Sequence, residues 1–221
     1  MFREIISHPV ASIRFIAKRL AQIPEKGLPN FNIGRRDEFD RKLGIDTAIL
    51  VRVVETDSEN QIHGRGYQAS DIKLVEWAIA SSGVPFEHTT FVDIGCGKGR
   101  VLILASRQPF KRIIGFDYSQ SLLNVCRRNL RHLRLETRCE TCLGDAASFP
   151  FPEGELMLFL YNPFDSPLFE TVLDRIKEIS APVTIAYLGP ERKSLECHWL
   201  REVGRFEGMR LYRNLHPSIE H

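Results

Sequence analysis

The chain has 221 residues, which suits one domain with a sizeable core and a small appendage. At 43% hydrophobic and 26% charged residues, the composition is typical of a soluble globular protein. Thirty Lys and Arg against 28 Asp and Glu give a formal net charge of +2, which neither demands nor excludes a polyanionic partner.

Neither a membrane span nor an export signal is expected. The longest apolar runs, such as LMLFLY (156–161), are far shorter than the roughly 18 residues that a membrane-spanning helix needs. Charged residues such as Arg3 and Arg14 interrupt the N-terminal segment, where a signal peptide would be continuously apolar. Five cysteines favour free thiols, and the pair Cys139 and Cys142 lacks the further ligands of a zinc site. We therefore expect a cytoplasmic protein without a metal.

Residues 1–65 are predicted to form a helical extension and a lid or linker. Apolar residues within 1–23 recur at roughly helical spacing, and this helix is expected to pack on the domain or on a second subunit, as in a homodimer. Because its basic residues are few, contact with a membrane surface is the weaker alternative. The polar segment 24–44 is predicted to be a linker or lid with one short helix. The pattern of AILVRVVE (48–55) fits a strand or a helix equally.

Residues 66–221 are predicted to form an α/β domain with a Rossmann-like sheet. A helix capped by Ser70 or Asp71 and ending at Gly83 comes first. Strands and helices then alternate, which indicates a mostly parallel sheet with helices on both faces. Strands are predicted at 89–94, 112–117, 137–145, 155–161 and 182–189. Helices are predicted at 100–108, 119–133, 166–180 and 191–203, and a hairpin within 206–215 adds an antiparallel edge.

The stretch FVDIGCGKGR (91–100) joins a predicted strand to a helix through Gly95, Gly97 and Gly99. Glycines allow a sharp turn and close approach of the backbone to a ligand. A dinucleotide fingerprint has the spacing GxGxxG, whereas this turn reads GxGxG and follows Asp93. A carboxylate there would repel a pyrophosphate but suits a ligand with an ammonium and a sulfonium. S-adenosylmethionine is therefore favoured over a nicotinamide dinucleotide, with a purely structural turn as the alternative.

Polar residues also end the next three predicted strands, at Asp117, at Asp145 and at YNPF (161–164). Open α/β sheets bind ligands at the carboxyl ends of their strands, where an acidic residue accepts hydrogen bonds from ribose hydroxyls. Asp117 suits that role, and Asp145 could bind an adenine amino group. Each acidic residue by itself could instead cap a helix. Their joint occurrence favours one ligand site.

In combination, FVDIGCGKGR, Asp117 and GDA (144–146) resemble the class I S-adenosylmethionine-dependent methyltransferases. The resemblance covers roughly residues 66–221 and implies a seven-stranded sheet with an antiparallel last strand. It implies that the three glycines approach the methionine moiety and ribose of S-adenosylmethionine, that Asp117 holds the ribose, and that Asp145 or Ala146 reads the adenine. The cofactor-binding residues expected on this basis are Tyr67, Asp93, Gly95, Cys96, Gly97, Gly99, Asp117, Tyr118, Asp145, Ala146 and Asn162.

A narrower resemblance involves FDRKLGIDT (39–47) and YQASD (67–71). Together with the glycine stretch and YNPF, they are similar to uncharacterised bacterial relatives of the histone lysine methyltransferases that lack a SET domain. That resemblance implies that Tyr67 closes over the cofactor. The alternative for Tyr67 is a packed aromatic residue in a turn.

The YNPF motif (161–164) is expected to carry the methyl transfer. It resembles the Asn/Asp-Pro-Pro-Tyr/Phe motif of amino-group methyltransferases, with one proline fewer. The side-chain oxygen of Asn162 and the carbonyl of Pro163 could accept N–H bonds from a neutral amine, and Phe164 would pack against the substrate. The missing proline leaves oxygen and carbon acceptors open, and the Asn-Pro pair could simply begin the next turn.

Several functions therefore stay open beside methyl transfer to an amine of a protein or small molecule. A nucleic-acid methyltransferase is disfavoured because the net charge is near zero. A non-catalytic module that binds the cofactor is less favoured because the glycine turn is intact, and a dehydrogenase comes last. Lys98 in the turn is expected to be solvated, and His63 is expected to be structural.

Overall fold

The computed structural model describes residues 36–49, 67–161 and 166–215. Three predictions lie outside these residues: the N-terminal helix with its proposed homodimer contact, His63 with most of the 48–55 segment, and the residues Asn162, Pro163 and Phe164.

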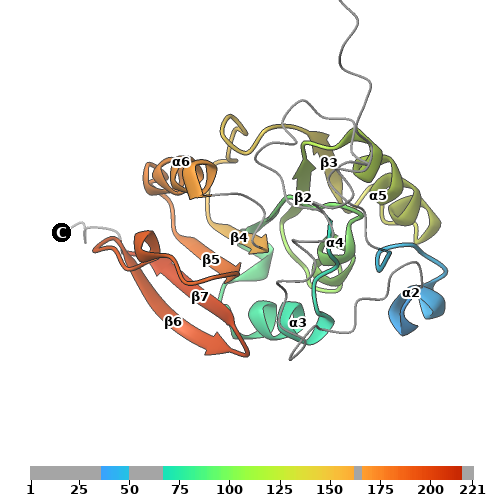
Figure 1. The fold of residues 1–221 in the computed structure, drawn as a ribbon, viewed down its shortest axis with the longest axis horizontal. Helices are drawn as coiled ribbons and strands as arrows, with labels where there is room; N and C mark the ends of the chain where they lie inside the picture. Colours follow the sequence, from blue (N-terminus) through green and yellow to red (C-terminus); the bar gives the residue numbers. More distant parts are fainter. Residues whose placement is uncertain (1–35, 50–66, 162–165, 216–221) are drawn as a thin grey trace, which may run out of the picture. The chain divides into compact units, whose positions relative to one another are not determined.

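One sheet of seven strands forms the centre of the described domain, in the order β3-β2-β1-β4-β5-β7-β6 (Figure 1). The strands are β1 Thr90–Ile94, β2 Arg112–Asp117, β3 Glu140–Leu143, β4 Leu156–Tyr161, β5 Val183–Leu188, β6 Leu200–Phe206 and β7 Met209–Asn214. Strands β1 to β5 pair in parallel, whereas β7 runs antiparallel to both β5 and β6. The predicted Rossmann-like, mostly parallel sheet is confirmed.

The helices of the described residues are α2 Glu38–Leu43, α3 Ile72–Ser81, α4 Arg100–Ala105, α5 Gln120–His132 and α6 Ser166–Lys177, with 3-10 turns η3 Phe86–His88 and η4 Lys193–Leu195. Two predicted caps are confirmed. The Asp71 carboxylate accepts hydrogen bonds from the first turn of α3, and the Ser119 hydroxyl accepts one from the first turn of α5. Each side chain satisfies N–H groups that have no partner within the helix.

Apolar side chains cover both faces of the sheet. Along β1, Phe91 belongs to the core cluster under α3, α4 and α5, whereas Val92 and Ile94 belong to the cluster under α6. This alternation follows from the two-residue repeat of a strand. The strands are buried on both faces because the βα connections place helices on each side. The sheet therefore presents its ends, not its faces, for ligand binding.

The predicted helix over 191–203 is wrong. Only η4 is helical there, and β6 begins at Leu200. Glu207 and Gly208, both with positive φ, form the turn to β7. The charged residues of β6 lie exposed at the edge of the sheet, so their spacing resembled that of a solvated helix. Pairing with β7, which no local pattern reveals, decides the strand.

Candidate functional site

The ends of the parallel strands lie at one edge of the sheet. In the pairing register, Asp93 of β1 lies opposite Gly115 of β2, and Asp117 at the end of β2 lies opposite Leu143 of β3. Strand β4 ends beside β1, at Tyr161. The polar residues predicted at the ends of four successive strands therefore do share one edge, except for the three that follow Tyr161 and lie outside the described residues.

The glycine turn between β1 and α4 has a backbone that only glycine adopts easily. Gly95, Gly97 and Gly99 have φ angles of 84°, 51° and 87°. A side chain at Gly97 would collide with the ring of Tyr67, and a Cβ at Gly99 would lie 2.5 Å from the Sγ of Cys126. The turn is as sharp as the sequence predicted, and the close contacts that the structure shows are with side chains of the protein itself.

Two buried carboxyl groups, those of Asp93 and Asp117, lie near these strand ends. Asp117, 4% exposed, accepts hydrogen bonds at 2.8 Å from the backbone N–H of Gly97 and at 2.8 Å from that of Ser119. Burial raises the pKa of Asp117 to about 6, although these backbone hydrogen bonds act in the opposite direction. Burial, together with the negative charge of Asp117, raises the pKa of Asp93 well above its usual range. The pair favours a ligand with hydroxyl donors and positive charge over a pyrophosphate.

The remaining predicted residues occupy different parts of this edge. Asp145 follows β3, and its carboxylate accepts a hydrogen bond at 2.9 Å from the N–H of Ala147, next to the buried Ala146. Tyr118 is half-buried beside Asp117. The side chain of Cys96 is turned into the core, in the apolar cluster under α4 and α5. Cys96 can therefore face a ligand at the strand ends only through its backbone.

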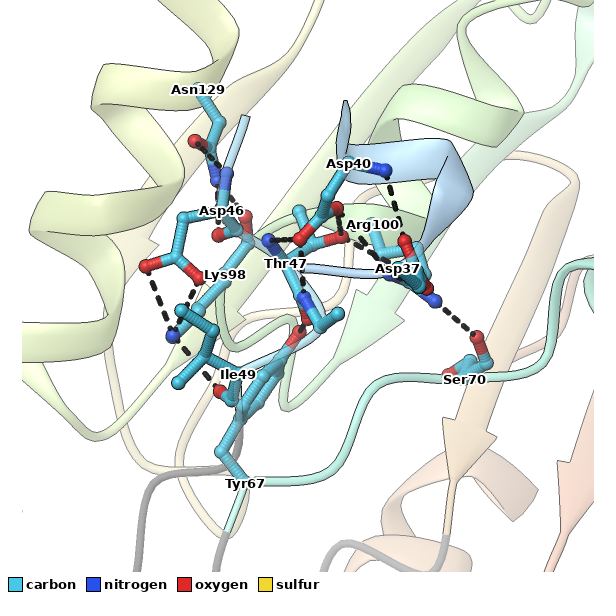
Figure 2. Close-up of polar contacts among 11 residues, drawn as sticks. Asp37, Asp40, Asp46, Thr47, Ile49, Tyr67, Ser70, Lys98, Arg100 and Asn129 are labelled. Carbon is cyan, nitrogen blue, oxygen red and sulfur yellow. Dashed lines mark hydrogen bonds and ion pairs between the residues drawn. The ribbon is translucent and has the colours of Figure 1, made fainter. Parts of the chain in front are cut away.

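Lys98 is not solvated, contrary to the sequence expectation. Its side chain is 3% exposed, and its Nζ lies 3.0 Å from an Oδ of Asp46 and 2.9 Å from the carbonyl oxygen of Ile49 (Figure 2). Both partner residues lie within residues 1–65, which are predicted to form a helical extension and a lid or linker. Lys98, a charged residue in the glycine turn, thus has its counterion 52 positions earlier in the chain, which local sequence reasoning does not reveal.

Sequence analysis missed five polar residues that surround the glycine turn. These are Asp37, Asp40, Asp46, Thr47 and Arg100, of which Asp40, Thr47 and Arg100 are buried. The signal for three of them was present, because FDRKLGIDT (39–47) carried part of a family resemblance and contains Asp40, Asp46 and Thr47. The resemblance assigned no role to these residues. Residues 37–49 are hydrogen-bonded to the domain that follows, although the sequence predicted a domain boundary after residue 65.

Neither a metal site nor a membrane span occurs in the part of the chain that the structure describes. No cluster of three or more His, Cys, Asp or Glu residues suitable for a metal lies within it. Cys139 and Cys142 are free thiols that point to different backbone carbonyls, those of Leu102 and Gly115. Over the same residues, no helix combines the length and the apolar character needed to cross a bilayer.

The comparisons with known proteins agree with this geometry. Residues 85–192, which include the glycine turn, Asp117 and Asp145, match the family model of the methyltransferase domain. The match covers 108 of the 221 residues, and these residues are similar to methyltransferase domains. The cofactor of the class I enzymes with this domain is S-adenosylmethionine, and the buried carboxyl pair fits its hydroxyl groups and positive charges.

Curated relatives of the methyltransferase domain differ in what they act on. An rRNA N(6)-adenosine-methyltransferase of Caenorhabditis elegans is 27% identical over 112 residues, covering 44% of this chain and 52% of the relative. A release factor glutamine methyltransferase of Mycobacterium leprae is 28% identical over 144 residues, covering 60% and 49%. The chain thus spans about half the length of these relatives. A 2-phytyl-1,4-naphtoquinone methyltransferase of Synechococcus elongatus is 29% identical over 112 residues, covering 49% and 46%.

Solved structures support the fold of the methyltransferase domain. A ribosomal protein L11 methylase from Lactobacillus delbrueckii superposes with a TM-score of 0.50 at 11% identity, covering 65% of this chain and 77% of that protein. A candidate RNA methyltransferase from Pyrococcus horikoshii superposes with a TM-score of 0.51 at 17% identity, covering 66% and 82%. At these identities the likeness concerns the fold alone.

Proposed function

We propose that the protein transfers the methyl group of S-adenosylmethionine to an amine of a protein or a small molecule. The observation that carries this proposal is the buried carboxyl pair Asp93 and Asp117 beside a glycine turn, at the edge where the parallel strands end. In this assignment Asp117 accepts hydrogen bonds from the ribose hydroxyls. Asp145 and Ala146 contact the adenine at the end of β3, and Tyr67 covers the turn.

The transfer itself is an in-line displacement at a carbon attached to a good leaving group. The protein therefore has to align the acceptor and exclude water. We assign the alignment to Asn162 and Pro163, whose oxygens would accept the N–H bonds of the amine, and the packing of the acceptor to Phe164. These residues directly follow Tyr161, which ends β4 next to β1.

The acceptor is the part of the proposal that the relatives leave open. One relative is named for a nitrogen of rRNA adenosine, another for a glutamine and a third for a quinone. The first name agrees with a nitrogen acceptor. A nucleic-acid or small-molecule methyltransferase and a non-catalytic module that binds the cofactor are the alternatives. The likeness of 39–47 and 67–71 to bacterial relatives of the non-SET histone lysine methyltransferases favours a protein acceptor. The cytoplasmic location and the homodimer stay predictions.

Binding of the cofactor is tested first, by titrating the protein calorimetrically with S-adenosylmethionine and with S-adenosylhomocysteine. We expect dissociation constants in the micromolar range and loss of binding in Asp117→Ala. Glu140→Gln, in the strand next to Asp117 but exposed, is the matched control and should bind as the unchanged protein does. Equal binding by all three proteins would refute the assignment of Asp117.

The acceptor is tested with methyl-labelled S-adenosylmethionine and lysate from a strain that lacks the gene. Label should appear in the protein or small-molecule fraction, and Asn162→Ala should lose the label while keeping more of the S-adenosylhomocysteine binding than Asp117→Ala does. Label in nucleic acid would select that alternative. Label in no fraction, with cofactor binding intact, would select the non-catalytic module.

A further inference from the structure

We propose that residues 37–49 are a positioning segment, whose buried polar network holds Tyr67 in place over the cofactor turn. The positioning residues are Asp40, Thr47 and Arg100, none of which needs to touch the cofactor. The inference rests on the proposed function and deepens it by naming what arranges the site.

The first step is the anchoring of Thr47 by Asp40. The Asp40 side chain is fully buried, and its Oδ1 accepts a hydrogen bond from the Thr47 hydroxyl at 2.5 Å. Its Oδ2 accepts two more, from the backbone N–H of Thr47 at 2.6 Å and from that of Ala48 at 2.7 Å. Three hydrogen bonds to one ionised group are stronger than neutral ones and leave the Thr47 backbone a single orientation.

Arg100 then ties this anchor to the methyltransferase domain (Figure 2). It is the first residue of α4, is 5% exposed, and donates from Nε to the Thr47 hydroxyl at 2.8 Å. Its Nη2 donates to Asp37 at 2.6 Å and to Asp40 at 3.3 Å, and its Nη1 donates to the carbonyl of Ser70 at 3.4 Å. The Arg100 guanidinium thus connects three parts of the protein: residues 37–49, the start of α4, and Ser70, which lies three positions after Tyr67.

A second set of contacts holds the other side of the segment. Asp46, which also bonds to Lys98, is held through its backbone by the Asn129 side chain of α5. The Asp46 N–H donates to the Asn129 side-chain oxygen at 3.1 Å, and the Asn129 side-chain N–H donates to the Asp46 carbonyl at 2.9 Å. The same Asn129 amide donates to the carbonyl of Lys98 at 3.0 Å. The segment and the glycine turn therefore share partners on both sides and cannot shift independently.

Tyr67 is the point at which these contacts meet the cofactor site. Its hydroxyl donates to the Thr47 carbonyl oxygen at 2.6 Å, and its ring packs on Gly97 with the Nζ of Lys98 5.6 Å from the ring centre. Burial raises the pKa of Tyr67 well above its usual range, so the phenol stays a hydrogen-bond donor. Thr47 thus presents its hydroxyl and N–H to the ionic network and its carbonyl to Tyr67.

A buried ionic network contributes little net stability compared with apolar packing of the same volume, because desolvation of the charges is costly. Its directional bonds do fix geometry. Here the bonds reach both Tyr67 and the turn from Gly97 to Arg100, which is where S-adenosylmethionine is proposed to bind. Orientation of that site explains the network better than stability alone.

The experiment is a double-mutant cycle on binding of S-adenosylhomocysteine, measured by calorimetry on Thr47→Val, Tyr67→Phe and the double variant. Each single variant should raise the dissociation constant about three- to tenfold, the size of one lost hydrogen bond. The dissociation constant of the double variant should not exceed that of the single variant that binds more weakly. The reason is that the Tyr67 hydroxyl no longer orients the ring once the Thr47 carbonyl is not held in place. Thermal midpoints of the free proteins are recorded alongside.

Two variants with the same substitutions elsewhere are the controls. Thr89→Val removes an equally buried threonine hydroxyl, but at the opposite end of β1, where it donates to the Pro85 carbonyl. Tyr187→Phe removes a phenol that donates to the Pro190 carbonyl at 3.0 Å. Both should lower the thermal midpoint and leave the dissociation constant unchanged.

Three results would overturn the inference. Unchanged affinity in Tyr67→Phe would do so even if Thr47→Val failed to fold. Effects of the two single variants that multiply in the double variant would show that Thr47 and Tyr67 act separately. Absence of binding of both S-adenosylmethionine and S-adenosylhomocysteine to the unchanged protein would remove the proposed function as well, which distinguishes the two failures.

Discussion

The ionic contacts of Arg100 and of Arg112 have similar lengths but very different surroundings. The Arg100 guanidinium lies 2.6 Å from Asp37 and 3.3 Å from Asp40, and the exposed fractions of the Arg100 and Asp40 side chains are 6% and 0%. Arg112 lies 2.8 Å from Glu140, but these side chains are 45% and 56% exposed. Water already solvates the second pair, whereas Arg100 and Asp40 have only the protein to satisfy their charges, and Asp37 is 26% exposed. Burial, not distance, decides what each contact does.

The contrast extends to position in the sheet. Arg112 and Glu140 lie at the beginnings of β2 and β3, whereas Arg100 follows the glycine turn at the end of β1. The ion pair of Arg112 and Glu140, at the beginnings of the strands, is a solvated surface contact. The ion pairs of Arg100 lie beside the carboxyl ends of the strands, next to the proposed cofactor site.

The largest effect is expected from Arg100→Ala. It leaves Asp40 buried without its counterion, so the free energy of unfolding should fall by about 3–5 kcal/mol. Urea unfolding of the variant measures the loss, and Arg112→Ala is the control with the same change of side chain. Equal losses in the two variants would contradict the distinction between buried and exposed contacts.

Asp117 should make stability depend on pH. Its pKa of about 6 in the folded protein exceeds the ordinary 3.8, so the folded state binds more protons than the unfolded state between those values. Stability should therefore fall as the pH rises from 4 to 7, by roughly 2–3 kcal/mol relative to Asp117→Asn. Unfolding both proteins across that range measures the difference. If the difference in unfolding free energy between the two proteins did not change with pH, Asp117 would be ionised across the whole range.

Alanine substitution separates backbone strain from contact at the glycines. Gly97 and Gly154 both have positive φ, but only a side chain at Gly97 would meet another group, the ring of Tyr67, within 4 Å. Gly154→Ala should cost about 1–2 kcal/mol from strain alone. Gly97→Ala should cost about 1–3 kcal/mol more, from overpacking, and should weaken binding of S-adenosylhomocysteine. Thermal unfolding and calorimetry check this, and equal costs would exclude tight packing of Tyr67 on the turn.

The smallest effect is expected from Glu140→Gln. Exposed ion pairs contribute about 0–1 kcal/mol, so the unfolding free energy should change by no more than that, and less in high salt. Urea unfolding at two salt concentrations is the measurement. A loss of unfolding free energy as large as that in Arg100→Ala would indicate that β3, the edge strand, is covered by another surface in solution.

Local patterns were sufficient for most of the fold. The caps Asp71 and Ser119 and the regular alternation after residue 89 predicted α3, α5 and the parallel strands, because capping and apolar periodicity act within a few residues. The same reasoning failed over 191–203. The exposed side chains of β6 carry no period that distinguishes an edge strand from a solvated helix, and the hydrogen bonds that make it a strand come from β7.

The sequence by itself therefore determined the α/β sheet, the glycine turn and the acidic residues Asp93 and Asp117 at the strand ends. Only the tertiary structure decided how Lys98 and Arg100 are neutralised and what holds Tyr67. Their acidic partners lie 52 to 63 positions earlier in the chain, within the residues predicted to form a helical extension and a lid or linker. Turn and strand signals are local, whereas satisfying a buried charge depends on whichever distant residues the fold brings to it.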